Sequence, residues 1–111
     1  MTVYLANAFS LSMLVPPASI RVTEVTVDDV KRVVAQGFVS AIGHDATAKI
    51  ISTQLGVQLP VNRVAIQLKP GDLLLVFQLL ARLPEGKILS VDEMKQMPAK
   101  WFLVTVSQGG E

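Results

Sequence analysis

A nearly unbroken apolar run over residues 73–80 constrains the fold of this chain more than any other stretch. Its sequence, LLLVFQLL, contains a single polar residue, Gln78. A short run of this kind is typical of a β-strand buried on both faces, in the middle of a covered sheet. Residues 63–69 precede it across a Pro-Gly-Asp turn and alternate between polar and apolar, which predicts a strand with one solvated face. The two segments are expected to form a hairpin.

The rest of the chain predicts further strands and helices. Thr26 and Ser90 each precede acidic residues at the start of a helical pattern, as N-caps do. Asp45 is expected to cap another helix, which ends with Gly56 in the left-handed conformation. Strand-like segments cover residues 3–6, 20–25, 38–42 and 101–106. Together these patterns predict an α/β fold with a mixed sheet of about five or six strands, flanked by about three helices, in one domain over residues 1–111.

Composition narrows the classes of function. Half of the residues are hydrophobic and 17% are charged, which favours an apolar interface between subunits. The chain has one histidine and no cysteine, so a zinc or iron site is poorly supported. A net charge of +1 argues against binding of long DNA or RNA, yet it is compatible with a small anionic ligand. No apolar run reaches the about 20 residues of a membrane helix, and the start lacks a signal-peptide pattern. The absence of cysteine suits the cytoplasm.

The only histidine, His44, lies between Gly43 and the predicted helix start at Asp45. Backbone N–H groups and the helix dipole favour an anion at such a position. Histidine titrates near neutral pH, so His44 is a natural general acid or base. The alternative is a histidine that only caps or packs the helix. Residue pattern alone leaves both possibilities open.

Other polar residues have equally simple structural explanations. Arg63 and Arg82 could each hold a phosphate, or lie on the surface as ordinary solvated arginines. Glu85, Asn7 and Ser10 are by default turn residues. A nucleophile elbow, a phosphate-binding glycine loop and a dinucleotide fingerprint are absent from the sequence, and no cofactor is expected.

Four segments taken together closely resemble the viral ring nucleases, a family that includes type III anti-CRISPR proteins. These segments are Tyr4–Ser10, Ile42–Asp45, Asn62–Val64 and Arg82–Leu89, in the same order and with similar spacing. The resemblance implies a homodimer with a mixed sheet flanked by helices. It also implies binding of cyclic tetra-adenylate, and cleavage without a metal to linear di-adenylates that end in 2′,3′-cyclic phosphate. Type III CRISPR signalling would thereby be switched off.

The same resemblance implies roles for individual residues. The catalytic histidine of the family falls on His44, and its assisting glutamate falls on Glu85. Ligand-binding positions of the family fall on Arg63, Arg82, Gln78, Ser10, Asn7 and Thr47. The chain departs from the family pattern at Ala46, Ala81, Pro84 and Ser12. These departures affect peripheral ligand contacts and rate more than the type of reaction.

Two other functions are compatible with the sequence. The first is a protein that binds a cyclic oligonucleotide without cleaving it, as a sponge or sensor. The second is a structural or regulatory nucleic-acid-binding dimer, against which the near-neutral charge argues. For the ring nuclease, the expected partners are cyclic tetra-adenylate and a second copy of the chain, and neither a membrane nor a long nucleic acid is expected. A virus-encoded member is expected in the host cytoplasm.

Overall fold

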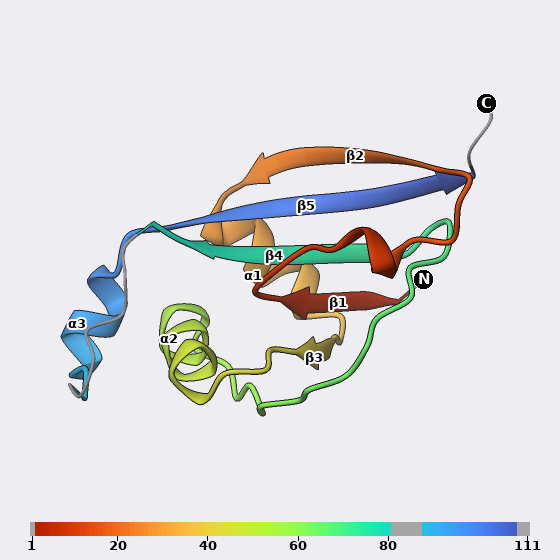
Figure 1. Cartoon of the computed structure of the whole chain (residues 1–111). Helices are drawn as coiled ribbons and strands as arrows, with labels where there is room; N and C mark the ends of the chain where they lie inside the picture. Colours follow the sequence, from red (N-terminus) through yellow and green to blue (C-terminus); the bar gives the residue numbers. More distant parts are fainter. Residues whose placement is uncertain (1, 81–87, 109–111) are drawn as a thin grey trace.

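Strand β4 (Leu73–Leu79) lies in the middle of a mixed five-stranded sheet, with the strand order β2-β5-β4-β1-β3 (Figure 1). This computed structural model describes residues 2–80 and 88–108. The other elements are β1 (Val3–Ala6), the short 3₁₀ helix η1 (Leu11–Met13), β2 (Ala18–Val25), α1 (Val27–Val34), β3 (Val39–Ala41), α2 (Asp45–Leu55), α3 (Val91–Gln96) and β5 (Ala99–Gln108). The predicted α/β fold, with a mixed sheet and helices, is therefore confirmed.

The apolar run forms the central strand that its sequence predicts. β4 pairs with β1 in parallel on one side and with β5 in antiparallel on the other. Leu74, Leu75, Val76 and Phe77 are all buried, and the Phe77 ring contacts that of Trp101 on β5 at a centroid distance of 5.0 Å. Burying these side chains on both faces anchors β4 between two layers of the protein.

The predicted hairpin between residues 63–69 and β4 is wrong. Residues 58–69 run without regular secondary structure, although Ile66 and Leu68 are buried as the alternation predicts. Both edges of β4 are already occupied by β1 and β5, so no edge remains to bond a preceding strand. The segment instead packs against one face of the sheet through Ile66 and Leu68, and the Leu68 N–H donates to the Met13 carbonyl at 2.7 Å.

Helices cover one face of the sheet and irregular chain covers part of the other. The first core cluster joins residues of α1, α2 and the sheet, including Val30, Ile50, Leu75 and Trp101, with α3 packed against it. The second cluster joins the opposite sheet face to η1 and to residues 66–68. In Figure 1, α1 lies behind the strands, while the chain leading to β2 passes in front of them. The central strands are thus buried between two unequal layers, whereas the edge strand β2 is largely exposed.

The three helices begin in different ways. Thr26 and Ser90 cap α1 and α3, each within a complete capping box, which confirms both predicted caps. The prediction that Asp45 caps α2 is wrong, because the N-cap is His44 and its side chain makes no capping hydrogen bond. Gly56 ends α2 in the left-handed conformation, with φ of 69°, as predicted. Only α2 among the described helices therefore starts without a side-chain cap.

Candidate functional site at the carboxyl edge of the parallel strands

Strands β1, β3 and β4 run parallel, so their carboxyl ends meet at one edge of the sheet. Asn7 directly follows β1, the Ile42–Gly43–His44 segment follows β3, and Gln78 lies near the end of β4. Loops at the carboxyl ends of strands in open α/β sheets are common ligand-binding places. The topology therefore brings together three of the sequence-predicted site residues that lie up to 71 positions apart, counting from Asn7 to Gln78.

His44 lies at this edge as an exposed residue at the start of α2. Its carbonyl accepts the first intrahelical hydrogen bond, from the Ala48 N–H at 2.9 Å, so the helix axis begins at this residue. No side chain among the described residues hydrogen-bonds the imidazole. The adjacent Asp45 carboxylate pairs with Lys49 at 3.1 Å, which offsets part of its negative charge next to the histidine.

Arg63 reaches the same place from the segment that follows α2. Its Nε donates to the Gly43 carbonyl at 2.8 Å, and its side chain is exposed. A Cβ added at Gly43 would lie 3.3 Å from Cγ of Arg63, so the two residues are in close contact. With Nε engaged, the terminal guanidinium nitrogens make no hydrogen bond to the described residues and are available to an anion.

The remaining predicted ligand residues differ in accessibility. Asn7 is half-buried beside β3, whereas Ser10 and Gln78 are exposed. The Ser10 hydroxyl caps η1 by accepting from the Ser12 N–H at 3.3 Å, and the Gln78 amide donates to the Leu79 carbonyl at 3.1 Å. Thr47 is 5% exposed, so its side chain belongs to the core. Its backbone N–H, in the first turn of α2, is one of the N–H groups that an α-helix leaves without an intrahelical acceptor.

Two predicted residues, Arg82 and Glu85, lie outside the described part of the chain, so their roles stay predictions. Among the described residues, no group of three or more histidines, cysteines or carboxylates could hold a metal ion. The helices of this same part of the chain are all too short or too polar to cross a membrane.

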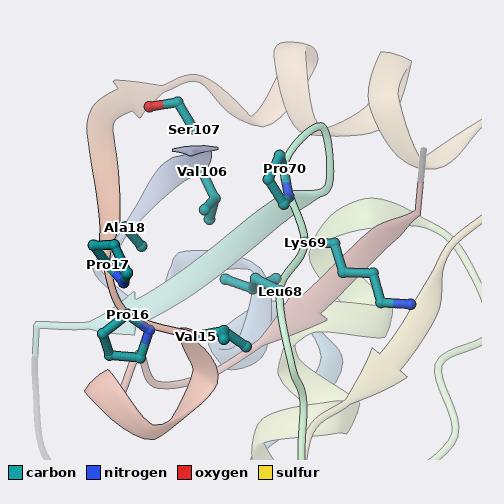
Figure 2. A pocket seen from close by; sticks show the side chains of 9 residues that line it. All are labelled: Val15, Pro16, Pro17, Ala18, Leu68, Lys69, Pro70, Val106 and Ser107. Atoms are coloured by element: carbon teal, nitrogen blue, oxygen red, sulfur yellow. The ribbon is translucent and has the colours of Figure 1, made fainter. Parts of the chain in front are cut away.

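A cavity of about 350 Å³ opens at the opposite end of the sheet, near the start of β2 and the end of β5. Figure 2 shows its mainly apolar lining, with Lys69 at the rim. The lining residues are Val15, Pro16, Pro17, Ala18, Leu68, Lys69, Pro70, Val106 and Ser107. None of the sequence-predicted site residues contributes to it, so this cavity is separate from the edge that carries His44.

Residues 3–101 match the family described as STIV B116-like. This chain belongs to that family. Protein 26 of Sulfolobus islandicus filamentous virus is 40% identical over 89 residues, covering 78% of this chain and 75% of the relative. ORF117 of Acidianus two-tailed virus is 34% identical over 96 residues, covering 83% of this chain and 82% of the relative. The STIV B116-like family thus includes proteins of archaeal viruses.

The solved structure of B116 from Sulfolobus turreted icosahedral virus has the same fold as this family member. The two structures superpose with a TM-score of 0.81, at 34% identity, over 95% of this chain and 99% of B116. The Bacillus subtilis protein YddF is also similar to this chain, at 26% identity over 102 residues, which cover 88% of this chain and 94% of YddF.

Proposed function

We propose that this STIV B116-like protein is a metal-independent ring nuclease. It binds cyclic tetra-adenylate and cleaves it to linear di-adenylates with 2′,3′-cyclic phosphate ends, which removes a messenger of type III CRISPR defence in the host cytoplasm. The proposal rests on the resemblance of four sequence segments to viral ring nucleases. The family membership is compatible with it, since the relatives named above are mostly viral.

The structural observation that best supports the proposal is the pairing of His44 with an uncapped helix N-terminus. The first N–H groups of α2 lack a side-chain acceptor, in contrast to α1 and α3, where capping boxes supply one. Unsatisfied N–H groups and the helix dipole attract a phosphate. Arg63 adds a cationic group one residue away from His44, through its bond to the Gly43 carbonyl. A phosphodiester bound here would lie within reach of an acid.

The chemistry needs few groups because RNA carries its own nucleophile. The ribose 2′-oxygen attacks the adjacent phosphorus, a new P–O2′ bond forms, and the P–O5′ bond breaks. The proton of the 2′-hydroxyl passes to solvent water, and the departing O5′ gains one from the general acid. His44, as the imidazolium, donates that proton, while Arg63 and Arg82 hold the negative phosphate oxygens. Glu85 is expected to orient His44 or the ribose.

A two-fold dimer would present two copies of His44 to opposite sides of a four-nucleotide ring. An isologous interface places identical residues symmetrically about its axis, so the ring and the protein would share that axis. Two cuts then release two identical di-adenylates. The homodimer is part of the proposal and stays a prediction from the sequence.

The decisive experiment incubates the protein with labelled cyclic tetra-adenylate in excess EDTA. We expect di-adenylates whose ends resist phosphatase until mild acid opens the cyclic phosphate. Recovery of bound but intact ring would reject the enzyme and leave a binding protein. Absence of both binding and cleavage would reject the ligand itself. A 3′-hydroxyl product would exclude attack by the 2′-hydroxyl.

The second candidate is a cyclic-oligonucleotide sponge or sensor, and one observation favours it. The His44 imidazole has no hydrogen-bond partner among the described residues, so the described part of the chain does not fix its orientation. General acids act efficiently only when they are held within reach of the leaving group. If the protein is a sponge or sensor, we expect tight binding and quantitative recovery of the uncut ring.

A further inference from the structure

A set of hydrogen bonds joins residues 60–63 to the segment that carries His44, and we call this set the clasp. The Ser40 hydroxyl donates to the Pro60 carbonyl at 2.7 Å. The Asn62 side-chain amide donates to the Ser40 carbonyl at 2.7 Å, and the Asn62 backbone N–H donates to the Ile42 carbonyl at 2.8 Å. A single residue, Asn62, therefore bonds two alternate carbonyls of the chain as it leaves β3.

The clasp continues to the residue that precedes His44. Arg63 donates from Nε to the Gly43 carbonyl at 2.8 Å. Carbonyls at positions 40, 42 and 43 are thus all held by two consecutive residues that are 20 or more positions away in the sequence. His44 is the next residue, and its own carbonyl accepts a hydrogen bond from the Ala48 N–H in α2.

Covering the edge of β3 would explain only part of this arrangement. β3 is a three-residue edge strand that pairs with β1 alone, and exposed strand edges are commonly covered by a loop. The bonds to Ile42 and Gly43, however, lie beyond the end of the strand at Ala41. Ser40 and Ile42 are 5% and 0% exposed, so the two residues whose carbonyls Asn62 bonds are buried in the core. The clasp therefore fixes the exit from β3 as well as its edge.

We propose that Asn62 is a positioning residue that sets the place of His44 through the Ser40 and Ile42 carbonyls, with Arg63 completing the support at Gly43. The catalytic consequence rests on the proposed function, whereas the effect on the His44 side chain does not. Asn62 acts on turnover through His44 and makes no contact with the reacting atoms. Misplacing a catalytic group by about 1 Å can lower a rate by about 100-fold.

The test replaces Asn62 with aspartate. Asn62→Asp keeps the size of the side chain, removes the Nδ2 donor and places a carboxylate against the Ser40 carbonyl. The matched control is Gln67→Glu, the same amide-to-acid change at an exposed position of the same segment that makes no bond to the described residues. Because His44 is the only histidine, the imidazole Cε1–H resonance in the NMR spectrum comes from this residue alone and reports directly on its surroundings.

We expect Asn62→Asp to shift or broaden the His44 imidazole signal and to lower kcat by at least about tenfold, with KM within about threefold of wild type. Gln67→Glu should leave the signal, kcat and KM unchanged. An Asn62→Asp protein that matches the control in both the signal and kcat would overturn the proposal. A raised KM with unchanged kcat would also overturn it, because Asn62 would then bind ligand rather than position His44.

Two further measurements keep the proposal testable. If Asn62→Asp does not fold, Ser40→Ala removes the hydroxyl bond to the Pro60 carbonyl and the longer bond, at 3.4 Å, that the same hydroxyl accepts from the Ile42 N–H. We expect a smaller shift of the His44 signal in the folded protein; an unshifted signal would overturn the proposal. If the wild type binds but does not cleave cyclic tetra-adenylate, the proposed enzyme fails. The inference is then decided by the His44 signal of Asn62→Asp alone.

Discussion

At the scale of single residues, His44 is the side chain on which the proposed reaction depends. It is exposed at the carboxyl edge of the sheet, so its replacement should leave the core intact. We expect His44→Ala to slow cleavage of cyclic tetra-adenylate by at least about 100-fold, because the leaving oxygen loses its proton donor. Affinity for the uncut ring, measured by titration calorimetry, should stay within a few-fold. Unchanged cleavage would show that another group is the acid.

Gly43 and Arg63 depend on one another through close contact. In Gly43→Ala, the new Cβ would meet Cγ of Arg63 at 3.3 Å, so the arginine must move. Because the Arg63 side chain is exposed and flexible, the free energy of unfolding should change by less than about 0.5 kcal/mol. We expect a several-fold weaker binding of the ring, measured by calorimetry.

A double-mutant cycle provides the control for this contact. Gly43→Ala should add no further loss of affinity when Arg63 is already alanine, because the same interaction has been removed. Fully additive losses would show that Gly43 acts independently of Arg63.

At the scale of helices and strands, the two ends of α2 have separate roles. The N-terminus carries His44, whereas the C-terminus is held by Gly56 in the left-handed conformation with open space around it. Gly56→Ala should cost about 1 kcal/mol of unfolding free energy, from backbone conformation alone. Urea denaturation should show this loss, and Gly56→Asn should lose less, since asparagine tolerates this conformation better.

The same variant separates stability from chemistry. Gly56 lies at the far end of an 11-residue helix from His44. Cleavage by the folded Gly56→Ala protein should therefore equal that of wild type. A large loss of kcat without unfolding would contradict the separation of roles along α2.

The start of α1 makes stability depend on pH. Hydrogen bonds from the backbone and side chain of Thr26 lower the pKa of Asp29 below 3.8, with a smaller contribution from Arg32. A lowered folded pKa means that this carboxylate stabilises the fold above about pH 3.8, and that the contribution is lost as the pH falls through the folded pKa. Asp29→Asn should therefore be less stable than wild type at pH 7, and the difference should narrow in acid.

The measurement is the urea midpoint from pH 7 to pH 2. Asp28→Asn is the matched control, since it removes the same charge one residue earlier, outside the capping box. Parallel pH profiles for wild type and Asp29→Asn would contradict the role of the capping carboxylate.

At the scale of the whole molecule, the proposal requires two sites in one dimer. A heterodimer of one wild-type chain and one His44→Ala chain, purified with two different tags, keeps a single acid. We expect it to cut the ring once and accumulate linear tetra-adenylate, whereas the wild-type dimer yields di-adenylates. Accumulation of di-adenylates by the heterodimer would contradict the assignment of one cut to each His44.

Much of this fold could be predicted from local sequence because its signals are local. The apolar run at 73–80 predicts a central strand, and Thr26, Ser90 and Gly56 predict helix ends from their own side-chain chemistry. The prediction of a hairpin was wrong because strand pairing is not a local property of the sequence. Alternation at residues 63–69 reports burial of Ile66 and Leu68, and burial occurs with or without a hydrogen-bonded partner strand. Which strand lies beside β4 depends on segments far away in the sequence.

The sequence by itself determined most of the helices and strands, with the exception of the strand predicted at residues 63–69, and that His44 stands at a helix start. Only the tertiary structure decided that β1, β3 and β4 run parallel and bring Asn7, His44 and Gln78 to one edge. It also decided that Asn62 and Arg63 donate hydrogen bonds to the segment before His44, and that Thr47 is buried. The physical reason is that helix caps and apolar runs act within a few residues, whereas strand order and the clasp arise from hydrogen bonds between distant parts of the chain.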